Sequence, residues 1–297
     1  MSKLLRKALR AVGYDLVRVP PRRPSAAAPA WSLDPRPVSS IWPLPRVPGG
    51  PSDAEIRAAF DRFELWHYAY ELEGGLSFPA RHREPGLATD DPRRPHQRFG
   101  HFMPYLLAAQ GGSLRGKRVL DIACNSGFWS LQCALLGAEV VGFDARPELI
   151  EQANLLKSLT GLENVEFRTL DFWEMTPETL GRTFDVVLFV GILYHLPKPL
   201  EALERTLAMC DGHLVLDTAV YTADAPLIQL RWEEPYDIRA AHRAGLVAFP
   251  TKRSIELMLR HLRVGRSMEV PTRGRELPPA YLAGGRASWV IERGPSS

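Results

Sequence analysis

The stretch that decides the fold runs from Val119 to Ser130 and reads VLDIACNSGFWS. Its apolar beginning, Val119 to Ile122, predicts a short strand that is buried on both faces. The small residues from Ala123 to Gly127 predict an abrupt turn, and a helix is expected to begin near Phe128. The free N–H groups at the start of such a helix attract ligand oxygens. The carboxyl end of this strand is therefore the first candidate binding edge.

The turn differs from the common phosphate-binding loops, because it fits neither G-x-G-x-x-G nor G-x-x-x-x-G-K-[ST]. Asp121 stands at the end of the strand, where open α/β sheets bind their ligands. Its carboxylate would repel a pyrophosphate and attract an amine. The pattern therefore favours a cofactor that carries an amino group.

From Lys117 onward, strand patterns alternate with helix patterns at regular spacing. The predicted strands are Arg118–Ile122, Glu139–Phe143, Val165–Thr169, Phe184–Phe189, His213–Asp217, Arg263–Val270 and Ala287–Ile291. The predicted helices are Trp129–Leu136, Pro147–Leu159, Pro199–Cys210 and Ser254–His261. This alternation is typical of an α/β fold with a doubly wound, mostly parallel sheet, here of seven strands.

The chain is expected to have an N-terminal helical extension in front of this fold. The predicted segments are a basic amphipathic helix at 1–19, a proline-rich linker at 20–51, an N-terminal cap on the substrate side at 52–112, and the binding domain at 113–297 with an insertion at 217–251. The helix at 1–19 has two interpretations: a solvated helix, or a peripheral contact with the inner face of a membrane.

The cap at 52–112 contains several local signals. Ser52-Asp53-Ala54-Glu55 fits a capping box at the start of a helix. Trp66–Leu72 reads as a strand that ends in a glycine turn. Arg81–Arg98 is predicted to be a basic loop, and Phe102–Gln110 a helix that leads into the sheet.

Composition limits the class of protein. The 297 residues are 45% hydrophobic and 24% charged, with a net charge of +3, which is ordinary for a globular protein and too small to indicate nucleic acid by itself. The three cysteines have no metal-ligand spacing and are expected to be buried thiols, so no metal is predicted. No apolar run reaches the ~20 residues of a membrane span. We expect a cytoplasmic protein.

Three further strand ends carry polar or aromatic groups. Asp144 follows Asp121 by 23 residues, close to the ~20 that separate a binding turn from a ribose-binding acid. Asp171 offers an acceptor for an adenine amino group, and Phe172 offers a ring to lie against the base. The stretch from Val190 to His195 brings a tyrosine and a histidine to the same edge. Such convergence predicts one binding site.

With these residues in place, the region from Lys117 to Asp217 resembles the class I S-adenosylmethionine (SAM)-dependent methyltransferases, which have a Rossmann-like fold. More narrowly, Cys124-Asn125-Ser126-Gly127-Phe128 and Gly191-Ile192-Leu193-Tyr194-His195-Leu196 resemble the tRNA wobble-uridine (5-oxyacetate) carboxymethyltransferase and its methyltransferase-like relatives. The resemblance extends from about Trp66 to the C-terminus.

This resemblance implies SAM as the cofactor. The residues implied to contact it are Asp121, Ala123, Cys124, Asn125, Gly127, Phe128, Asp144, Asp171, Phe172, Val190 and Tyr194. Ala123 and Asn125 replace two glycines of the usual loop, and asparagine tolerates left-handed backbone angles. The alternative cofactor is carboxy-SAM, whose extra carboxylate could contact the basic residues Arg93, Arg94 and Arg98.

His195 and Tyr194 are the predicted catalytic residues: His195 orients or deprotonates the acceptor, and Tyr194 closes on the cofactor. The acceptor pocket is expected to include Tyr221, Arg231, Trp232 and Tyr236 of the insertion. Three functions follow. The first is methyl transfer to a hydroxyl of a small molecule or glycan, the second is modification of a tRNA wobble uridine, and the third is a non-catalytic SAM-binding scaffold.

Overall fold

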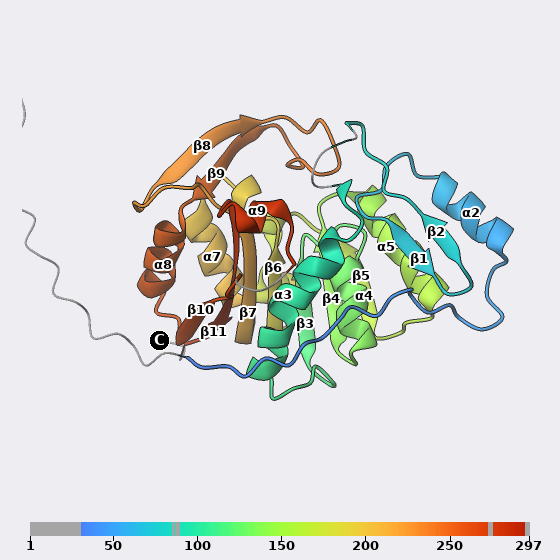
Figure 1. The fold of residues 1–297 in the computed structure, drawn as a ribbon, viewed down its shortest axis with the longest axis horizontal. Helices are drawn as coiled ribbons and strands as arrows, with labels where there is room; N and C mark the ends of the chain where they lie inside the picture. The colour runs from blue at the N-terminus through green and yellow to red at the C-terminus, as the bar shows by residue number, and fades with distance from the viewer. Residues whose placement is uncertain (1–30, 85, 87–89, 273–275, 295–297) are drawn as a thin grey trace, which may run out of the picture. The chain divides into compact units, whose positions relative to one another are not determined.

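The computed structural model describes residues 31–84, 86, 90–272 and 276–294. By its internal contacts the chain divides into Met1–Ser32 and Leu33–Ser297, and the second unit is described here (Figure 1). The helix predicted at 1–19, with its two interpretations, lies outside the described residues.

The described elements alternate in the order that the sequence predicts from residue 118 onward. The helices are α2 (Asp53–Asp61), α3 (Arg94–Ala109), α4 (Phe128–Leu135), α5 (Pro147–Thr160), α6 (Pro177–Leu180), α7 (Pro199–Ala208), α8 (Lys252–His261) and α9 (Pro279–Leu282). The strands are β1 (Tyr70–Leu72), β2 (Leu76–Phe78), β3 (Arg118–Ile122), β4 (Glu139–Asp144), β5 (Val165–Thr169), β6 (Phe184–Val190), β7 (Cys210–Ala219), β8 (Ile228–Glu233), β9 (Gly245–Pro250), β10 (Arg266–Glu269) and β11 (Arg286–Glu292).

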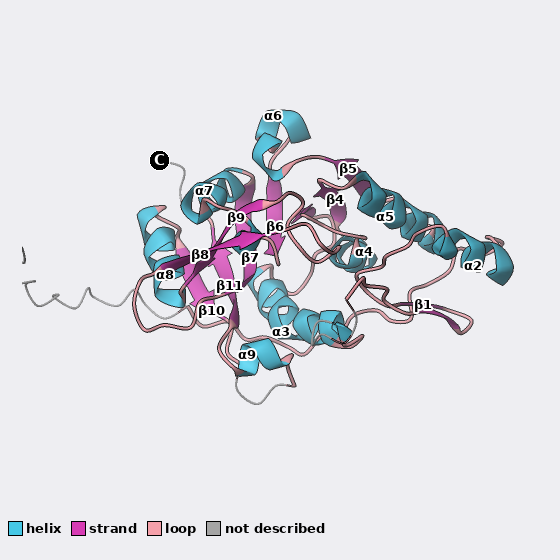
Figure 2. Cartoon of the chain, turned by 90° about the horizontal axis from the view of Figure 1, so that it is seen from above, coloured by secondary structure: helices cyan, strands magenta, loops and turns pink. Residues whose placement is uncertain are grey.

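Seven strands form one sheet in the order β10-β11-β7-β6-β3-β4-β5. The strands β5, β4, β3, β6 and β7 are parallel, and β11 pairs antiparallel with both β7 and β10. Helices cover both faces, and Figure 2 shows α3 and α7 on opposite sides of the strands. The predicted fold class, a doubly wound and mostly parallel α/β sheet, is confirmed.

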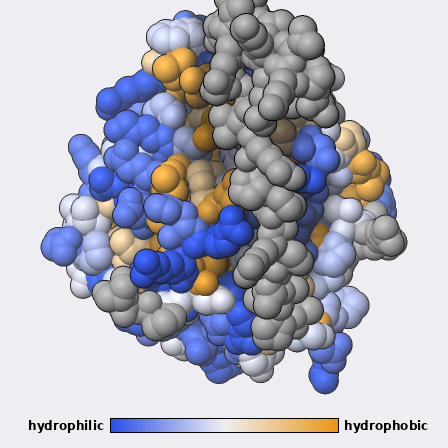
Figure 3. All heavy atoms as spheres, turned by 90° about the vertical axis from the view of Figure 1, so that its left-hand side faces the viewer, coloured by the Kyte–Doolittle hydropathy of each residue, from blue (hydrophilic) through white to orange (hydrophobic). Residues whose placement is uncertain are grey.

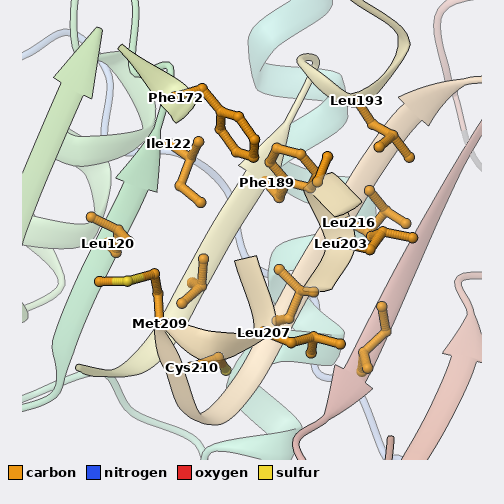
Figure 4. Packing of buried hydrophobic residues seen from close by; sticks show 14 of the residues in the cluster. Leu120, Ile122, Phe172, Phe189, Leu193, Leu203, Leu207, Met209, Cys210 and Leu216 are labelled. Atoms are coloured by element: carbon orange, nitrogen blue, oxygen red, sulfur yellow. The ribbon is translucent and has the colours of Figure 1, made fainter. Parts of the chain in front are cut away.

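The core on the α7 side joins the sheet to the helices behind it. Leu120, Phe189 and Leu216 come from neighbouring strands and meet Leu203 and Leu207 of α7 in one buried cluster (Figure 4). Each of these side chains is at most 2% exposed. Burying an aliphatic or aromatic side chain contributes about 1.5–3 kcal/mol, so this cluster holds the strand ends that form the binding edge.

Two predicted boundaries assign residues to the wrong type of element, and the strands predicted at Trp66–Leu72 and Arg263–Val270 are shorter, at Tyr70–Leu72 and Arg266–Glu269. The predicted basic loop at 81–98 contains the first turns of α3, which begins at Arg94 and not at Phe102. Pro95 suggested a loop, but proline fits the first turn of a helix because its missing N–H has no partner there. The second error concerns Cys210, which starts β7 and does not end α7.

The described part of the predicted linker packs on the domain. Leu44 is 1% exposed, donates its N–H to the carbonyl of Glu71 at 2.9 Å and accepts from the N–H of Glu73 at 2.9 Å. Ile41 exchanges two hydrogen bonds with the Gln132 side chain. The proline content of this segment predicted a linker, but Leu44, which lies between prolines, is buried against the domain.

The insertion predicted at 217–251 begins within β7, which continues to Ala219. Beyond it, β8 and β9 form an antiparallel two-stranded ribbon outside the large sheet. The exposed large apolar side chains of this ribbon include Ile228, Leu230, Trp232 and Leu246. Figure 3 shows the side of the molecule that lies at the left of Figure 1, where hydrophilic atoms surround separate apolar areas. None of the helices among the described residues has the length and apolar character needed to cross a bilayer.

Candidate active site

A cavity of about 560 Å³ opens at the carboxyl ends of β3, β4, β5 and β6. Nine predicted site residues line it, namely Ala123, Cys124, Asn125, Asp144, Asp171, Phe172, Val190, Tyr194 and His195. Asp121, Gly127 and Phe128 are not among the lining residues. The fold therefore brings the four predicted strand ends to one place.

The turn after β3 has the left-handed backbone that its sequence suggested. Ala123 has a φ of 55° and Asn125 a φ of 53°, at positions where related loops use glycine. Asn125 Oδ1 accepts the N–H of Ser126 at 2.8 Å, which supports this conformation locally. Gly127 has a φ of 87° and precedes α4.

Asp121 is buried behind the residues that line the cavity. Its carboxylate is 1% exposed and accepts the Ser130 hydroxyl at 2.6 Å, which joins the end of β3 to α4. Its second oxygen is buried and has no hydrogen-bond partner among the described residues. Burial raises the pKa of Asp121 to about 7, and the nearby charge of Asp144 adds to the shift.

Asp144 is the carboxylate that faces the cavity from β4. It accepts the backbone N–H of Asn125 at 3.1 Å and that of Arg146 at 3.1 Å. These contacts fix both carboxylate oxygens and leave lone pairs toward the cavity. Burial raises the pKa of Asp144, while the hydrogen bonds from the backbone counteract burial.

Asp171 and Phe172 follow β5. Asp171 accepts the N–H of Trp173 at 2.9 Å, so it caps the 3₁₀ turn Phe172–Glu174. The Phe172 ring stacks on Phe189 with 5.6 Å between centroids and also lines the cavity. Asp171 thus caps the turn and also lies, half-buried, among the residues that line the cavity.

Tyr194 and His195 lie in the 3₁₀ turn after β6. His195 Nδ1 is 2.6 Å from Glu233 Oε2, and this carboxylate also accepts the N–H of Ala241 at 2.9 Å. Burial acts to lower the pKa of His195, but Tyr194 and Glu233 outweigh it and raise the pKa. Burial acts to raise the pKa of Tyr194, but His195, Arg286 and Arg94 bring it down to about 8.

A group of guanidinium side chains lines the cavity beside Tyr194: Arg94, Arg98 and Arg286, which we call the arginine cluster. Asp217, at the end of β7, accepts Arg98 at 2.6 Å and Arg286 at 2.5 and 2.8 Å. Within the described residues, Arg94 forms no ion pair with a carboxylate. Burial lowers the pKa of Arg94 to about 10, and the charges of Arg98 and Arg286 add to the shift.

Some predicted pocket residues lie elsewhere. Tyr236 lines the cavity, but Tyr221, Arg231 and Trp232 do not. Trp232 is 66% exposed, and Arg231 lies over the Phe249 ring at 4.3 Å. Side chains along a strand alternate between two faces, so Trp232 lies on the face opposite to Glu233, which lines the cavity. Arg93 pairs with Asp91 at 2.9 Å and is not part of the cavity lining.

Three important residues were missed by the sequence reasoning: Glu233, Asp217 and Arg286. Asp217 interrupts the apolar run of β7, and Arg286 begins the apolar strand β11; a charge in or next to such a run is a signal for a buried partner. Glu233 carries no comparable signal because charged residues surround it in the sequence.

The three cysteines are free and buried. Burial raises the pKa of Cys210 to about 12 and that of Cys124 well above its usual value, so neither thiol is suited to be a nucleophile at neutral pH. Among the described residues, no three His, Cys, Asp or Glu side chains are grouped so that they could hold a metal ion.

Comparison with known proteins agrees with this geometry. Residues 113–243 match the family model described as "Methyltransferase domain". The chain is 30% identical over 111 residues to the ubiquinone biosynthesis O-methyltransferase of Acinetobacter baumannii (strain AYE), which covers 37% of this chain and 46% of that protein. It is 37% identical over 101 residues to the enzyme of the same name from Bordetella parapertussis, which covers 33% of this chain and 40% of that protein. The chain thus spans less than half the length of these curated relatives.

A solved structure gives the fold over a larger region. The N-terminal domain of EvdMO1 with S-adenosylhomocysteine (SAH) bound has a TM-score of 0.60 and 20% identity, and it covers 84% of this chain and 99% of that one. At this identity the likeness concerns the fold, which is Rossmann-like. The family model therefore identifies a methyltransferase domain over residues 113–243, and the solved structure shows the same Rossmann-like fold around it.

Proposed function

We propose that this protein transfers a methyl group from SAM to a hydroxyl of a small molecule or glycan. The observation that carries the proposal is the position of His195. It lies in the same cavity as Asp144, and its ring is held by the Glu233 carboxylate at 2.6 Å. A histidine held in this way next to a cofactor site is suited to accept a proton from a hydroxyl.

The residues present fit SAM. Asp144 has both oxygens oriented by backbone N–H groups and can accept hydrogen bonds from ribose hydroxyls. Asp171 and Phe172 lie next along the edge and suit the adenine. Arg94, a buried cation without a carboxylate partner among the described residues, suits the cofactor's carboxylate.

SAM supplies a methyl group on a positively charged sulfur, which makes that methyl electrophilic. The protein has to align the acceptor oxygen with the methyl group and take up the hydroxyl proton as the carbon–oxygen bond forms and the carbon–sulfur bond breaks. Because Nδ1 of His195 is engaged by Glu233, Nε2 is the nitrogen that can accept this proton. Tyr194 lies beside His195 and closes the cavity wall next to Arg286.

The relatives support an oxygen acceptor, because they are named O-methyltransferases. The EvdMO1 N-terminal domain was also solved in the presence of SAH and D-fucose, with a TM-score of 0.58. We extend both features to this chain as part of the proposal. Leu246 of β9 and Tyr236, in the connection between β8 and β9, would form the outer wall against the acceptor.

The arginine cluster supports carboxy-SAM as a second cofactor candidate. Two of its guanidinium groups, those of Arg98 and Arg286, share the carboxylate of Asp217, and Arg94 adds a third positive charge, so a ligand with an additional carboxylate would find positive charge beside Tyr194. Arg94 and Arg98 belong to this cluster, whereas Arg93 does not.

The cofactor part is tested by calorimetric titration with SAH. We expect Asp144→Asn to weaken SAH binding about 10- to 100-fold, since the ribose hydroxyls lose a charged acceptor. Glu139→Gln is the matched control: this glutamate starts the same strand, far from the cavity, with a side chain that is 62% exposed. Equal SAH affinity of the two variants would contradict the assigned site. Titration with carboxy-SAM decides between the two cofactors.

The acceptor part is tested by mass spectrometry of small molecules, glycans and tRNA nucleosides from wild-type and deletion cells. Loss of one O-methylated small molecule or glycan in the deletion cells would support the proposal. Loss of a modified wobble uridine would replace it with the tRNA function. A protein that binds SAH while the two cell types have identical methylated products would support a non-catalytic scaffold.

A further inference from the structure

The β8–β9 ribbon brings a carboxylate to the cavity from a segment outside the large sheet. Glu233 is the last residue of β8 and lies 38 positions after His195 in the chain. Its Oε2 is 2.6 Å from His195 Nδ1, and the two side chains are only 19% and 11% exposed. Charge-assisted hydrogen bonds of this length are strong where water has little access.

The carboxylate is itself held in place. Glu233 Oε2 accepts the N–H of Ala241 at 2.9 Å, which ties the end of β8 to the connection between the two strands. Arg146, which follows β4, donates to the carbonyl of Ala240 at 2.7 Å. The connection is thus attached to the sheet edge beside Asp144, and Glu233 has little freedom to turn away.

We infer that Glu233 is a positioning residue for His195: it holds Nδ1 as the protonated nitrogen and leaves Nε2 free to accept the acceptor's proton. This inference rests on the proposed function. The physical reason is that a neutral histidine has one donor and one acceptor nitrogen, and a carboxylate can only accept. The carboxylate also stabilises the imidazolium that forms when Nε2 takes up a proton.

Other charges face the same ring and have to be separated from the effect of Glu233. Tyr194 comes from the same turn, with 4.1 Å between the ring centroids, and acts to raise the pKa of His195. Arg146 approaches from the start of α5 and acts to lower it, as does burial. Glu233 is the carboxylate that contacts the ring directly.

The test is NMR titration of the SAH-bound full chain, with His195 assigned by comparison with His195→Asn. In the wild type, two-bond ¹H–¹⁵N spectra should show neutral His195 protonated at Nδ1. In Glu233→Gln, which keeps the shape of the side chain, we expect the His195 titration midpoint to fall by about one pH unit. Glu234→Gln is the matched control, because that neighbouring carboxylate bonds Trp232 and not His195.

Two results would overturn the inference. One is a wild-type His195 that is protonated at Nε2 in its neutral form. This measurement uses the wild type, so it does not depend on the folding of any variant. The other is an unchanged midpoint in Glu233→Gln with SAH affinity like that of the wild type. If the spectra agree with the inference but no hydroxyl acceptor exists, the ring pairing stands and the proposed function alone fails.

Once the acceptor is known, the same variant has a kinetic outcome. We expect kcat of Glu233→Gln to fall by about tenfold or more, within the range that general base catalysis contributes, with KM for SAM unchanged. An equal loss of kcat in Glu234→Gln would show that the effect comes from a change in the structure of the ribbon. This result would contradict the positioning role of Glu233.

Discussion

Asp217 illustrates at the scale of single residues how a buried charge is held. It is 0% exposed, and its carboxylate accepts from Arg98, Arg286, Ser288 at 2.6 Å and the Tyr281 hydroxyl. Burial acts to raise the pKa of Asp217, but the two arginines outweigh burial and hold it far below the usual range. The Asp217 carboxylate therefore stays ionised and holds Arg98 and Arg286 in place.

We predict that Asp217→Asn lowers the free energy of unfolding by about 3–5 kcal/mol, because two buried guanidinium groups lose their counter-charge. The measurement is urea unfolding at neutral pH. Asp224→Asn serves as the control, since its side chain is 89% exposed, and should have little effect. Similar losses in both variants would contradict the role assigned to Asp217.

This residue also predicts a pH dependence. Because the folded-state pKa of Asp217 is depressed, its contribution is fully present above its unfolded-state pKa of ~3.9 and is lost as the pH falls below that value. The difference in the free energy of unfolding between wild type and Asp217→Asn, measured by the same urea unfolding, should therefore shrink as the pH is lowered below ~3.9.

The sequence predicted residues that line the cavity where these follow a strand. Asp144, Asp171 and Tyr194 lie at strand ends, and local pattern alone locates a strand end. It did not reveal Glu233 or Arg286, because their importance depends on which segments pack together. Arg93 shows the converse: it is adjacent to Arg94 in sequence but lies outside the cavity lining.

At the scale of elements, the β3–α4 unit depends on Gly127. This residue has a φ of 87°, and a Cβ added there would lie 2.7 Å from Cζ of Phe167 on β5. Glycine is therefore needed both for its backbone angle and for the close approach of the Phe167 ring.

We predict that Gly127→Ala is destabilised more than Gly181→Ala. Gly181 also has a left-handed φ, 74°, but nothing lies within 4 Å of an added Cβ. In both variants the left-handed backbone angle lowers the free energy of unfolding by about 1–2 kcal/mol. In Gly127→Ala the clash with the Phe167 ring lowers it further. Thermal unfolding of the two proteins measures the difference; equal midpoints would contradict the argument.

Elements were predictable to different degrees. Strands β3 and β5 begin and end where their apolar patterns predict, because buried parallel strands have nearly continuous apolar sequences. Helix α3 begins eight residues earlier than expected, at Arg94, because its first turns are rich in arginine and proline. Two of these arginines, Arg94 and Arg98, line the cavity and do not follow the apolar pattern of a packed helix.

At the scale of the whole chain, the division after Ser32 leads to a prediction with two truncations. A chain that begins at residue 33 should keep the thermal midpoint and SAH affinity of the full chain. A chain that begins at residue 53 should lose stability, since it lacks the buried Leu44 and the pairing of Ile41 with Gln132. Removing a buried leucine alone costs about 2–5 kcal/mol.

The measurement is differential scanning calorimetry with and without SAH. A large loss of stability in the chain that begins at residue 33 would contradict the prediction and show that residues 1–32 contribute to the fold of the domain. The membrane interpretation of residues 1–19 is tested by sedimentation with anionic phospholipid vesicles. The full chain is compared with the chain that begins at residue 33.

The sequence by itself determined the α/β class, the strand order along the chain and the acidic binding edge, because these follow from local periodicity and from residues at strand ends. Only the tertiary structure decided which charges meet. Glu233 reaches His195 because a separate ribbon returns to the sheet, and Arg286 reaches Asp217 because the antiparallel strand β11 pairs with β7. Residues 41–44 pack on the domain because the proline-rich segment also returns to it. The side-chain contacts among these join residues 38 to 91 positions apart, and no local pattern contains them.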